Sequence, residues 1–184
     1  MAPLLDPVDR PGLFMRLVYG IARWQYGKTL MPLRVIYSRA PALLMVGVAI
    51  EWIRSHALRL EPGLARLLIV RVALHHGCEF CTDLGEAVAI QHGIGDERFR
   101  ELHRWRTSGA FTPRERIALA WIDDILLNGG IQKATFEEAK AMFSERELVE
   151  LTWLQASETY FNLQAHPLGL PSDGVAAIAR RASR

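Results

Sequence analysis

Hydrophobic residues recur at intervals of three and four along most of this chain, which is the spacing of one face of an α-helix. Apart from a weak candidate in LLIVRV (Leu67–Val72), which the surrounding helical spacing absorbs, no strand-like alternation appears. The segment KTLMPLRVIYSRAP, residues 28–41, is a proline-punctuated connector with room for one short helix. The pattern therefore predicts an all-α fold. Helices are expected over Gly12–Tyr26, Ala42–His56, Pro62–His75, Cys78–His92, Asp96–Trp105, Thr112–Leu127, Thr135–Met142, Ser144–Ala165 and Asp173–Arg181.

Three helix starts in the second half are marked by a hydroxyl residue followed three positions later by glutamate. In this capping box the hydroxyl accepts a backbone N–H and the glutamate reaches back to the first residue. The segments are Thr112-Pro-Arg-Glu115, Thr135-Phe-Glu-Glu138 and Ser144-Glu-Arg-Glu147. We expect a single domain over residues 1–184, in which residues 1–11 form a flexible N-terminal arm.

Composition excludes several classes of protein. Half of the 184 residues are hydrophobic, so the chain can form a core, and a net charge of +2 is too small to indicate nucleic-acid binding. The N-terminus lacks the basic start and apolar core of a signal peptide. The longest apolar run, Ala40–Ile50, is about half of the ~20 residues that a membrane span needs. These features predict a soluble cytoplasmic protein that binds neither membrane nor nucleic acid.

The only two cysteines, Cys78 and Cys81, stand three residues apart just after Gly77. On a helix this spacing places both side chains on one face, within reach of a disulfide after small adjustment. Cys78 falls in the first helical turn, where free N–H groups and the helix dipole stabilise a thiolate. The pair can be interpreted as a redox couple, as part of a metal site or as two inert buried thiols.

The metal interpretation gains from His75 and His76, which precede the cysteines directly. A structural zinc site needs four ligands, usually with a second pair well separated in sequence. The remaining histidines show no such spacing, so metal is the weaker interpretation and no metal or other cofactor is predicted. We favour His75 and His76 as helix-terminal polar residues near the negative end of the dipole.

The segment LARLLIVRVALHHGCEFCTDLGEAVAIQHGI, residues 64–94, resembles the core motif of the alkylhydroperoxidase D-like and carboxymuconolactone decarboxylase superfamily. Flanking segments are also similar to this family and extend the resemblance from about Gly12 to Pro171. They are YGKTLMPLRVI, APALL, FTPRERIALAWIDDILLN, FSERELVELTWLQASETYFN and PLGLP. The resemblance implies an all-helical protein that assembles into homotrimers or homohexamers. In the peroxidase branch it implies that Cys78 and Cys81 cycle between dithiol and disulfide, reducing a peroxide or disulfide or passing electrons to a redox partner protein.

The peroxidase branch carries the motif E-x11-C-x2-C-x3-H, whose glutamate and histidine relay protons to the second cysteine. Arg66 stands at the glutamate position and Gly85 at the histidine position, so the relay is missing. Arg66 could lie beside the thiols and favour thiolate, or extend to solvent. Gly85 could leave space for a ligand above Cys81, or allow two helices to pack closely.

We predict an alkylhydroperoxidase D-like thiol oxidoreductase with Cys78 and Cys81 as its redox pair. One alternative is lactone decarboxylation, for which Glu158 or His166 would have to supply the base, although both are expected at the surface or at a helix end. Another is a non-catalytic oligomeric binding protein. An oligomer is expected because Ala42–Ile53 and Leu64–Leu74 are apolar nearly all round and need cover on more than one side.

Overall fold

A computed structural model describes residues 2–91, 93 and 96–182, and over these residues the all-α prediction is confirmed. The last part of the predicted core motif, at residues 92 and 94, lies outside the described residues. Within them, no helix has the length and hydropathy that crossing a membrane requires. The helices are α1 (Leu13–Tyr26), α2 (Pro41–His56), α3 (Pro62–His76), α4 (Glu79–Gln91), α5 (Asp96–Glu101), α6 (Pro113–Asn128), α7 (Lys133–Met142), α8 (Glu145–Ala165) and α9 (Val175–Ala182), with short helical turns at Leu33–Tyr37, Leu102–Arg104 and His166–Leu168.

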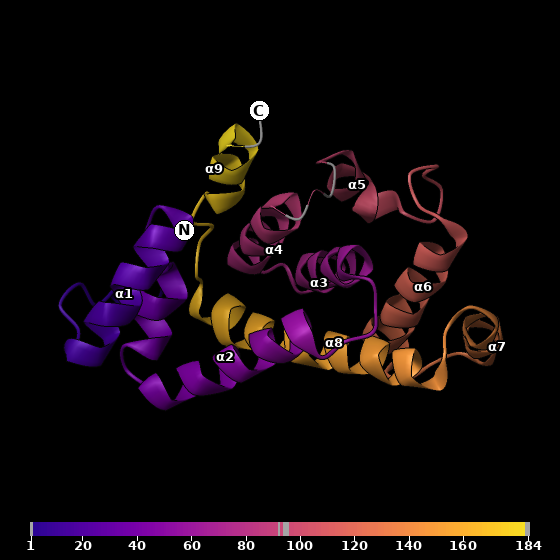
Figure 1. The fold of residues 1–184 in the computed structure, drawn as a ribbon, viewed down its shortest axis with the longest axis horizontal. Helices are drawn as coiled ribbons and strands as arrows, with labels where there is room; N and C mark the ends of the chain where they lie inside the picture. The colour runs from indigo at the N-terminus through magenta and orange to yellow at the C-terminus, as the bar shows by residue number, and fades with distance from the viewer. Residues whose placement is uncertain (1, 92, 94–95, 183–184) are drawn as a thin grey trace.

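Helix α3 lies at the centre of the molecule and packs against α4, α6 and α8 (Figure 1). Eight of its residues are buried, on all sides of the helix. The sequence predicted that Leu64–Leu74 needs cover on more than one side, and the chain itself supplies that cover. The apolar character of α3 is therefore no argument for oligomerisation.

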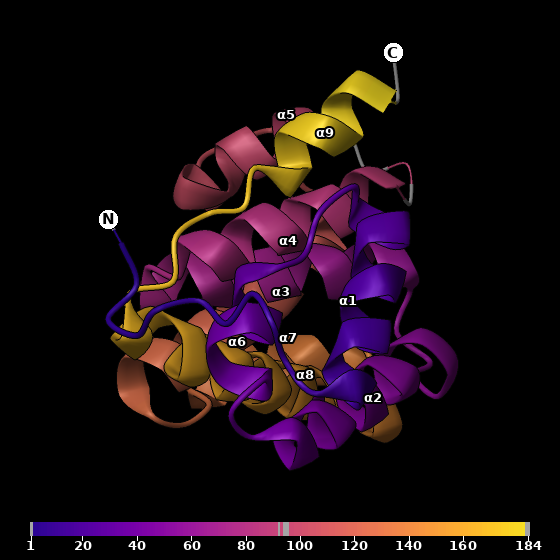
Figure 2. The ribbon, with the colours of Figure 1, turned by 90° about the vertical axis from the view of Figure 1, so that its left-hand side faces the viewer.

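The buried residues form two clusters. The larger one joins α3 to α6, α7 and the first half of α8, and it includes Trp105 and Trp121. The smaller one joins α1, α4, the end of α8 and α9, and it contains Cys78 and Cys81. Figure 2 shows α1, α4 and α9 from the side on which this second cluster lies. The cysteine pair is therefore placed away from the two buried tryptophans.

The N-terminal residues are held against the body of the protein rather than forming the free arm that was expected. The Leu4 N–H donates to the Leu168 carbonyl at 2.9 Å, and the Val8 N–H donates to the Arg34 carbonyl at 3.0 Å. The Tyr19 hydroxyl donates to the Val8 carbonyl at 2.7 Å. These long-range bonds fix a segment whose composition alone suggested flexibility.

Two of the three predicted capping boxes are confirmed. Thr112 and Ser144 each accept the N–H of the glutamate three residues on, and that glutamate reaches back to the capping residue. The prediction at Thr135 is wrong, because α7 begins two residues earlier, after Gln132. The Asp124 carboxylate accepts the Gln132 N–H at 2.9 Å, so a tertiary contact sets this helix start. The connector holds its one short helix as a π-helical turn at Leu33–Tyr37.

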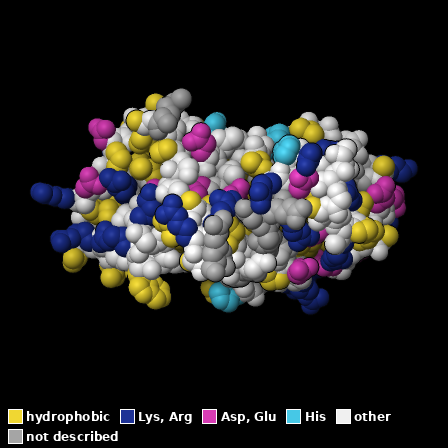
Figure 3. All heavy atoms as spheres, turned by 90° about the horizontal axis from the view of Figure 1, so that it is seen from above, with side chains coloured by type: hydrophobic (Ala, Val, Ile, Leu, Met, Phe, Trp, Pro, Cys, Tyr) yellow, Lys and Arg dark blue, Asp and Glu magenta, His cyan; other side chains and the backbone are white. Residues whose placement is uncertain are grey.

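Helices α1 and α2 present apolar side chains to solvent. On α1 the exposed residues follow one stripe, Leu13, Leu17, Ile21 and Trp24, of which Trp24 is 87% exposed. On α2 only Gly47 is buried, whereas Met45, Val48 and Trp52 are exposed. Figure 3 shows hydrophobic side chains at the surface of the end of the molecule that α1 occupies in Figure 1. Several exposed apolar side chains on the same helices are typical of a surface that binds another protein.

We propose that this surface joins copies of the chain. Substituting aspartate for both Trp24 and Trp52 should lower the molar mass measured by light scattering at micromolar concentration, because a buried charge without a partner is costly. Leu127→Asp is the matched control, since Leu127 is exposed on α6 and should leave the mass unchanged. A wild-type protein that is already monomeric would refute the proposal.

Candidate functional site

Cys78 directly precedes α4 and caps it. Its carbonyl accepts the Thr82 N–H at 2.9 Å, and its sulfur accepts the Cys81 N–H at 3.2 Å. The sulfur thus occupies the place that a capping side-chain oxygen usually takes at a helix N-terminus. The two cysteines are joined as a disulfide, with their Cα atoms 5.2 Å apart. Free N–H groups and the positive end of the α4 dipole favour a negatively charged sulfur at Cys78.

Gly77 makes this placement possible. It ends α3 in the left-handed conformation, with φ of +66°, a region that non-glycine residues rarely enter. The chain then turns directly into α4, so that the cysteines lie in the corner between the two helices. Both are buried, with Cys78 1% and Cys81 6% exposed.

His75 and His76 occupy the last turn of α3, as the helix-terminal interpretation expected. The Nε2 atom of His76 lies 3.1 Å from the Thr159 hydroxyl on α8, so this ring is directed to α8. Burial, together with His75 and His166, lowers the pKa of His76. Among the described residues, no group of three or more His, Cys, Asp or Glu side chains could hold a metal ion.

Gly85 allows α4 to pack closely on α3. A β-carbon added at Gly85 would lie 3.0 Å from Cγ2 of Val70 and 3.6 Å from Cγ2 of Ile69. The position is therefore filled by neighbouring side chains, and the interpretation of Gly85 as space for a ligand is wrong. The histidine of the family relay has no room here unless α4 moves.

Substituting histidine for Gly85 would reinstate the residue of the family motif, but we expect it to destabilise the protein. The imidazole would overpack the α3–α4 interface, a change that typically costs about 1–3 kcal/mol and sometimes more. Urea unfolding should show the loss. Gly85→Ala is the control and should lower the free energy of unfolding less than Gly85→His. Alanine makes one tight contact, with Val70, and its helix propensity is about 1 kcal/mol better than that of glycine, which offsets the contact. Equal stability of Gly85→His and wild type would contradict the close packing.

The sequence left two positions open for Arg66, beside the thiols or extended into solvent, and the structure instead pairs it with a carboxylate of α2. Its guanidinium Nη1 lies 3.6 Å from a carboxylate oxygen of Glu51 on α2. The side chain is largely buried, so it does not extend into solvent. Arg66, which stands at the position of the family glutamate, therefore forms an ion pair with α2.

Two acidic residues of α4 hold α9 over the cysteine-containing cluster. The Asp83 carboxylate accepts the N–H groups of Val175 and Ala176 at 3.0 and 2.8 Å, at the start of α9. Glu86 pairs with Arg180 at 2.6 Å. Both carboxylates thus fasten α9 to α4.

Glu158 on α8 is a buried carboxylate, 3% exposed and in the middle of its helix, so its expected surface position is wrong. Its Oε2 atom lies 3.0 Å from Arg54 Nη2 on α2, and its Oε1 atom accepts a 2.8 Å hydrogen bond from Asn162 Nδ2. Burial raises the pKa of Glu158 to about 7, although Arg54 and Asn162 act in the opposite direction. His166, in contrast, is exposed in the turn after α8, as expected.

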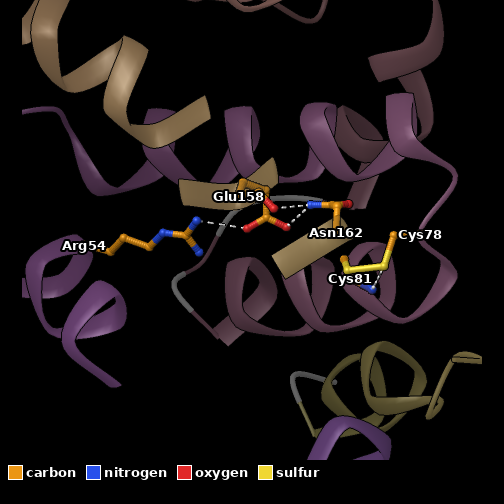
Figure 4. The surroundings of a disulfide bond; sticks show 5 residues. All are labelled: Arg54, Cys78, Cys81, Glu158 and Asn162. Atoms are coloured by element: carbon orange, nitrogen blue, oxygen red, sulfur yellow. Dashed lines mark hydrogen bonds and ion pairs between the residues drawn. A yellow bond between two sulfur atoms is a disulfide. The ribbon is translucent and has the colours of Figure 1, made fainter. Parts of the chain in front are cut away.

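Asn162 lies between Glu158 and the cysteine pair in Figure 4, with its amide nitrogen facing Glu158. Two contacts flank Asn162 along the chain and hold the end of α8 against the corner between α3 and α4. Before it in sequence, Thr159 contacts His76; after it, the His166 ring lies 3.6 Å from the β-carbon position of Gly77. Asn162 is fully buried, and its Oδ1 atom has no hydrogen-bond partner.

The sequence did not point to Arg54 or Asn162. The available signal is a pair of polar residues one turn apart, Glu158 and Asn162, in a helix with many apolar positions. In the sequence, such a pair is equally consistent with a solvent-exposed face of the helix and with two buried polar residues. Only the packing of α8 against α2 and α4 shows that the pair is buried.

Comparison with known proteins agrees with this architecture. Residues 48–124 match the carboxymuconolactone decarboxylase family. The uncharacterized protein YnjA of Escherichia coli is 24% identical over 181 residues, covering 97% of this chain and 99% of that protein. A crystal structure of a protein of unknown function from Agrobacterium tumefaciens is 25% identical, with a TM-score of 0.70, and covers 76% of this chain and 97% of that one.

An uncharacterized peroxidase-related protein from Ralstonia eutropha, described as an alkylhydroperoxidase AhpD core, superposes with a TM-score of 0.81. It is 15% identical, and the match covers 98% of both chains. This likeness shows the fold. Residues 48–124, which include both cysteines, thus match the carboxymuconolactone decarboxylase family, and the chain has the AhpD-like fold.

Proposed function

We propose that the protein is a thiol oxidoreductase that cycles Cys78 and Cys81 between dithiol and disulfide and reduces a small peroxide or disulfide substrate. The single observation that carries the proposal is the position of Cys78 as the cap of α4. Its sulfur already accepts the Cys81 N–H, which is the bond that would stabilise a thiolate. A thiolate is both the attacking species and the good leaving group in thiol–disulfide exchange.

The absence of the glutamate–histidine proton relay favours a disulfide over a peroxide as the substrate. General acid–base help is typically worth about 10²–10⁴-fold, and neither Arg66 nor Gly85 supplies it. Disulfide exchange depends mainly on the thiolate and the leaving group, so it is affected less by this loss. The burial of both sulfurs also favours a small substrate.

A redox titration of the Cys78–Cys81 couple tests the proposal. The protein is equilibrated with mixtures of a dithiol and its disulfide, quenched, alkylated and analysed by mass spectrometry. We expect the peptide that contains both cysteines to carry two alkyl groups when the pair is reduced and none when it is oxidised. The change should be reversible and should be confined to this peptide. Thiols that never re-form a disulfide would refute the redox function and favour a non-catalytic binding protein, whose ligand binding should survive replacement of both cysteines by serine.

A further inference from the structure

We propose, on the basis of the oxidoreductase function above, that Glu158 binds the proton that accompanies reduction of the cysteine pair, and that Asn162 positions the reduced thiol. Both residues lie on α8, one turn apart, outside the positions where the family motif has its relay. They would replace that relay from a different helix.

The first argument is the balance of buried charge. Glu158 faces one buried cation, Arg54, whose side chain is only 4% exposed. When the cysteines are a disulfide they carry no charge, so the Glu158 carboxylate and Arg54 neutralise each other. Reduction creates a thiolate at Cys78, in a site that is 1% exposed. Two neighbouring buried anions cannot both remain ionised without a large cost, so one of them takes up a proton.

The second argument is that Glu158 is poised for this change. Its pKa is raised to about 7 by burial, so the carboxyl titrates near neutral pH in the oxidised protein. A thiolate nearby acts in the same direction as burial and raises the pKa further. The charged groups that act on Glu158 directly are Arg54 and Glu51 on α2. Further out on α3, Arg66 pairs with Glu51 and His76 contacts Thr159, and the cysteine pair lies on α4.

The third argument is the free oxygen of Asn162. In the disulfide state its amide nitrogen donates to Glu158, and its Oδ1 atom is buried without a partner. An unpaired buried acceptor is costly, and a disulfide has no proton to offer it. The S–H of a reduced cysteine is a donor that the disulfide lacks. Asn162 is therefore a positioning residue that holds the reduced thiol through Oδ1 and Glu158 through Nδ2.

The reaction balances in atoms and electrons. An external dithiol gives two electrons to the Cys78–Cys81 bond, which breaks, and the dithiol itself becomes a disulfide. Of its two protons, one goes to the Cys81 sulfur and the other to the Glu158 carboxylate. Cys78 remains as the thiolate at the N-terminus of α4. The buried site has the same net charge before and after the reaction.

The test is the pH dependence of the equilibrium with a dithiol. Above about pH 7 the wild-type reaction consumes and releases no net proton, so its equilibrium constant should be nearly independent of pH. In Glu158→Gln the second proton leaves to solvent, and the constant should rise about tenfold per pH unit. Glu51→Gln is the matched control, because Glu51 pairs with the same Arg54 at 2.7 Å but its side chain is 46% exposed; its pH slope should equal that of wild type.

Infrared spectroscopy provides a second readout that needs no variant. The redox difference spectrum of the wild-type protein at about pH 8, with isotope-labelled glutamate, should show a protonated carboxyl band that appears on reduction. Absence of the band, or equal pH slopes in wild type and Glu158→Gln, overturns the inference while leaving the oxidoreductase intact. A wild-type pair that never equilibrates with the dithiol overturns both proposals. For Asn162→Ala, we expect a pH slope between those of wild type and Glu158→Gln.

Discussion

Serine in place of Cys78 should abolish reduction of peroxide or disulfide substrates, with a loss on the order of 10³-fold or more. A serine hydroxyl is hardly ionised near neutral pH, and the loss of a nucleophile is among the most damaging changes to an enzyme. Cys81→Ser should be equally inactive in turnover, because no second sulfur is left to close the disulfide. The measurement is the rate of substrate reduction with a dithiol as electron donor.

The two single variants should nevertheless differ in their remaining thiol. In Cys81→Ser, Cys78 keeps its place at the start of α4 and its bond from the residue 81 N–H, so it should react with iodoacetamide at neutral pH after local opening. In Cys78→Ser, Cys81 lies within the helix without that support and should react more slowly. Equal alkylation rates of the two variants would contradict the assignment of Cys78 as the thiolate.

Arg54→Met should destabilise the protein by about 3–5 kcal/mol at alkaline pH, since removal of one partner of a buried ion pair leaves an uncompensated charge. Arg54 is buried between Glu158 at 3.0 Å and Glu51 at 2.7 Å. Loss of the cation raises the pKa of Glu158 further, so at low pH the carboxyl is neutral and the penalty is smaller. Urea unfolding at about pH 5, 7 and 9 measures the effect.

The sign of the pH dependence follows from the raised pKa of Glu158. The unfolded protein has a glutamate pKa near 4.5, and the folded protein one of about 7. Below pH 4.5 Glu158 is protonated in both the folded and the unfolded protein, so it does not lower the free energy of unfolding. As the pH rises toward 7, the free energy of unfolding falls, because the folded state holds this proton more tightly than the unfolded state. In Arg54→Met the fall should continue above pH 7. A penalty that is the same at all three pH values, or that Glu158→Gln fails to suppress in the double variant, would show that Arg54 acts mainly through packing.

Local sequence signals predicted most of the helices well, since those signals act within one or two turns. The boxes at Thr112 and Ser144 are self-contained, and the structure forms both. The box at Thr135 has the same local pattern, but the Asp124 carboxylate holds the Gln132 backbone and starts the helix earlier. A capping pattern thus predicts a helix start only where no distant side chain competes for the same backbone groups.

The cysteine pair could be identified from the sequence, whereas the surroundings of the pair could not. The spacing of Cys78 and Cys81 and their position after Gly77 are local, and they suffice to predict two thiols at the start of a helix. The burial of Glu158 depends on α2 and α4, which meet α8 from segments about 100 and 80 residues away in sequence. Nothing in the residues next to Glu158 distinguishes a buried carboxylate from an exposed one.

By itself, the sequence determined the all-α class, the family resemblance and the loss of both relay residues, because each depends on residue identity at a fixed spacing. Only the tertiary structure decided what replaced them. It filled the space at Gly85 with Val70, paired Arg66 with Glu51, and brought Glu158 and Asn162 to the cysteines from another helix. The physical reason is that burial and charge pairing arise between segments distant in sequence, and these interactions set the chemistry of a buried site.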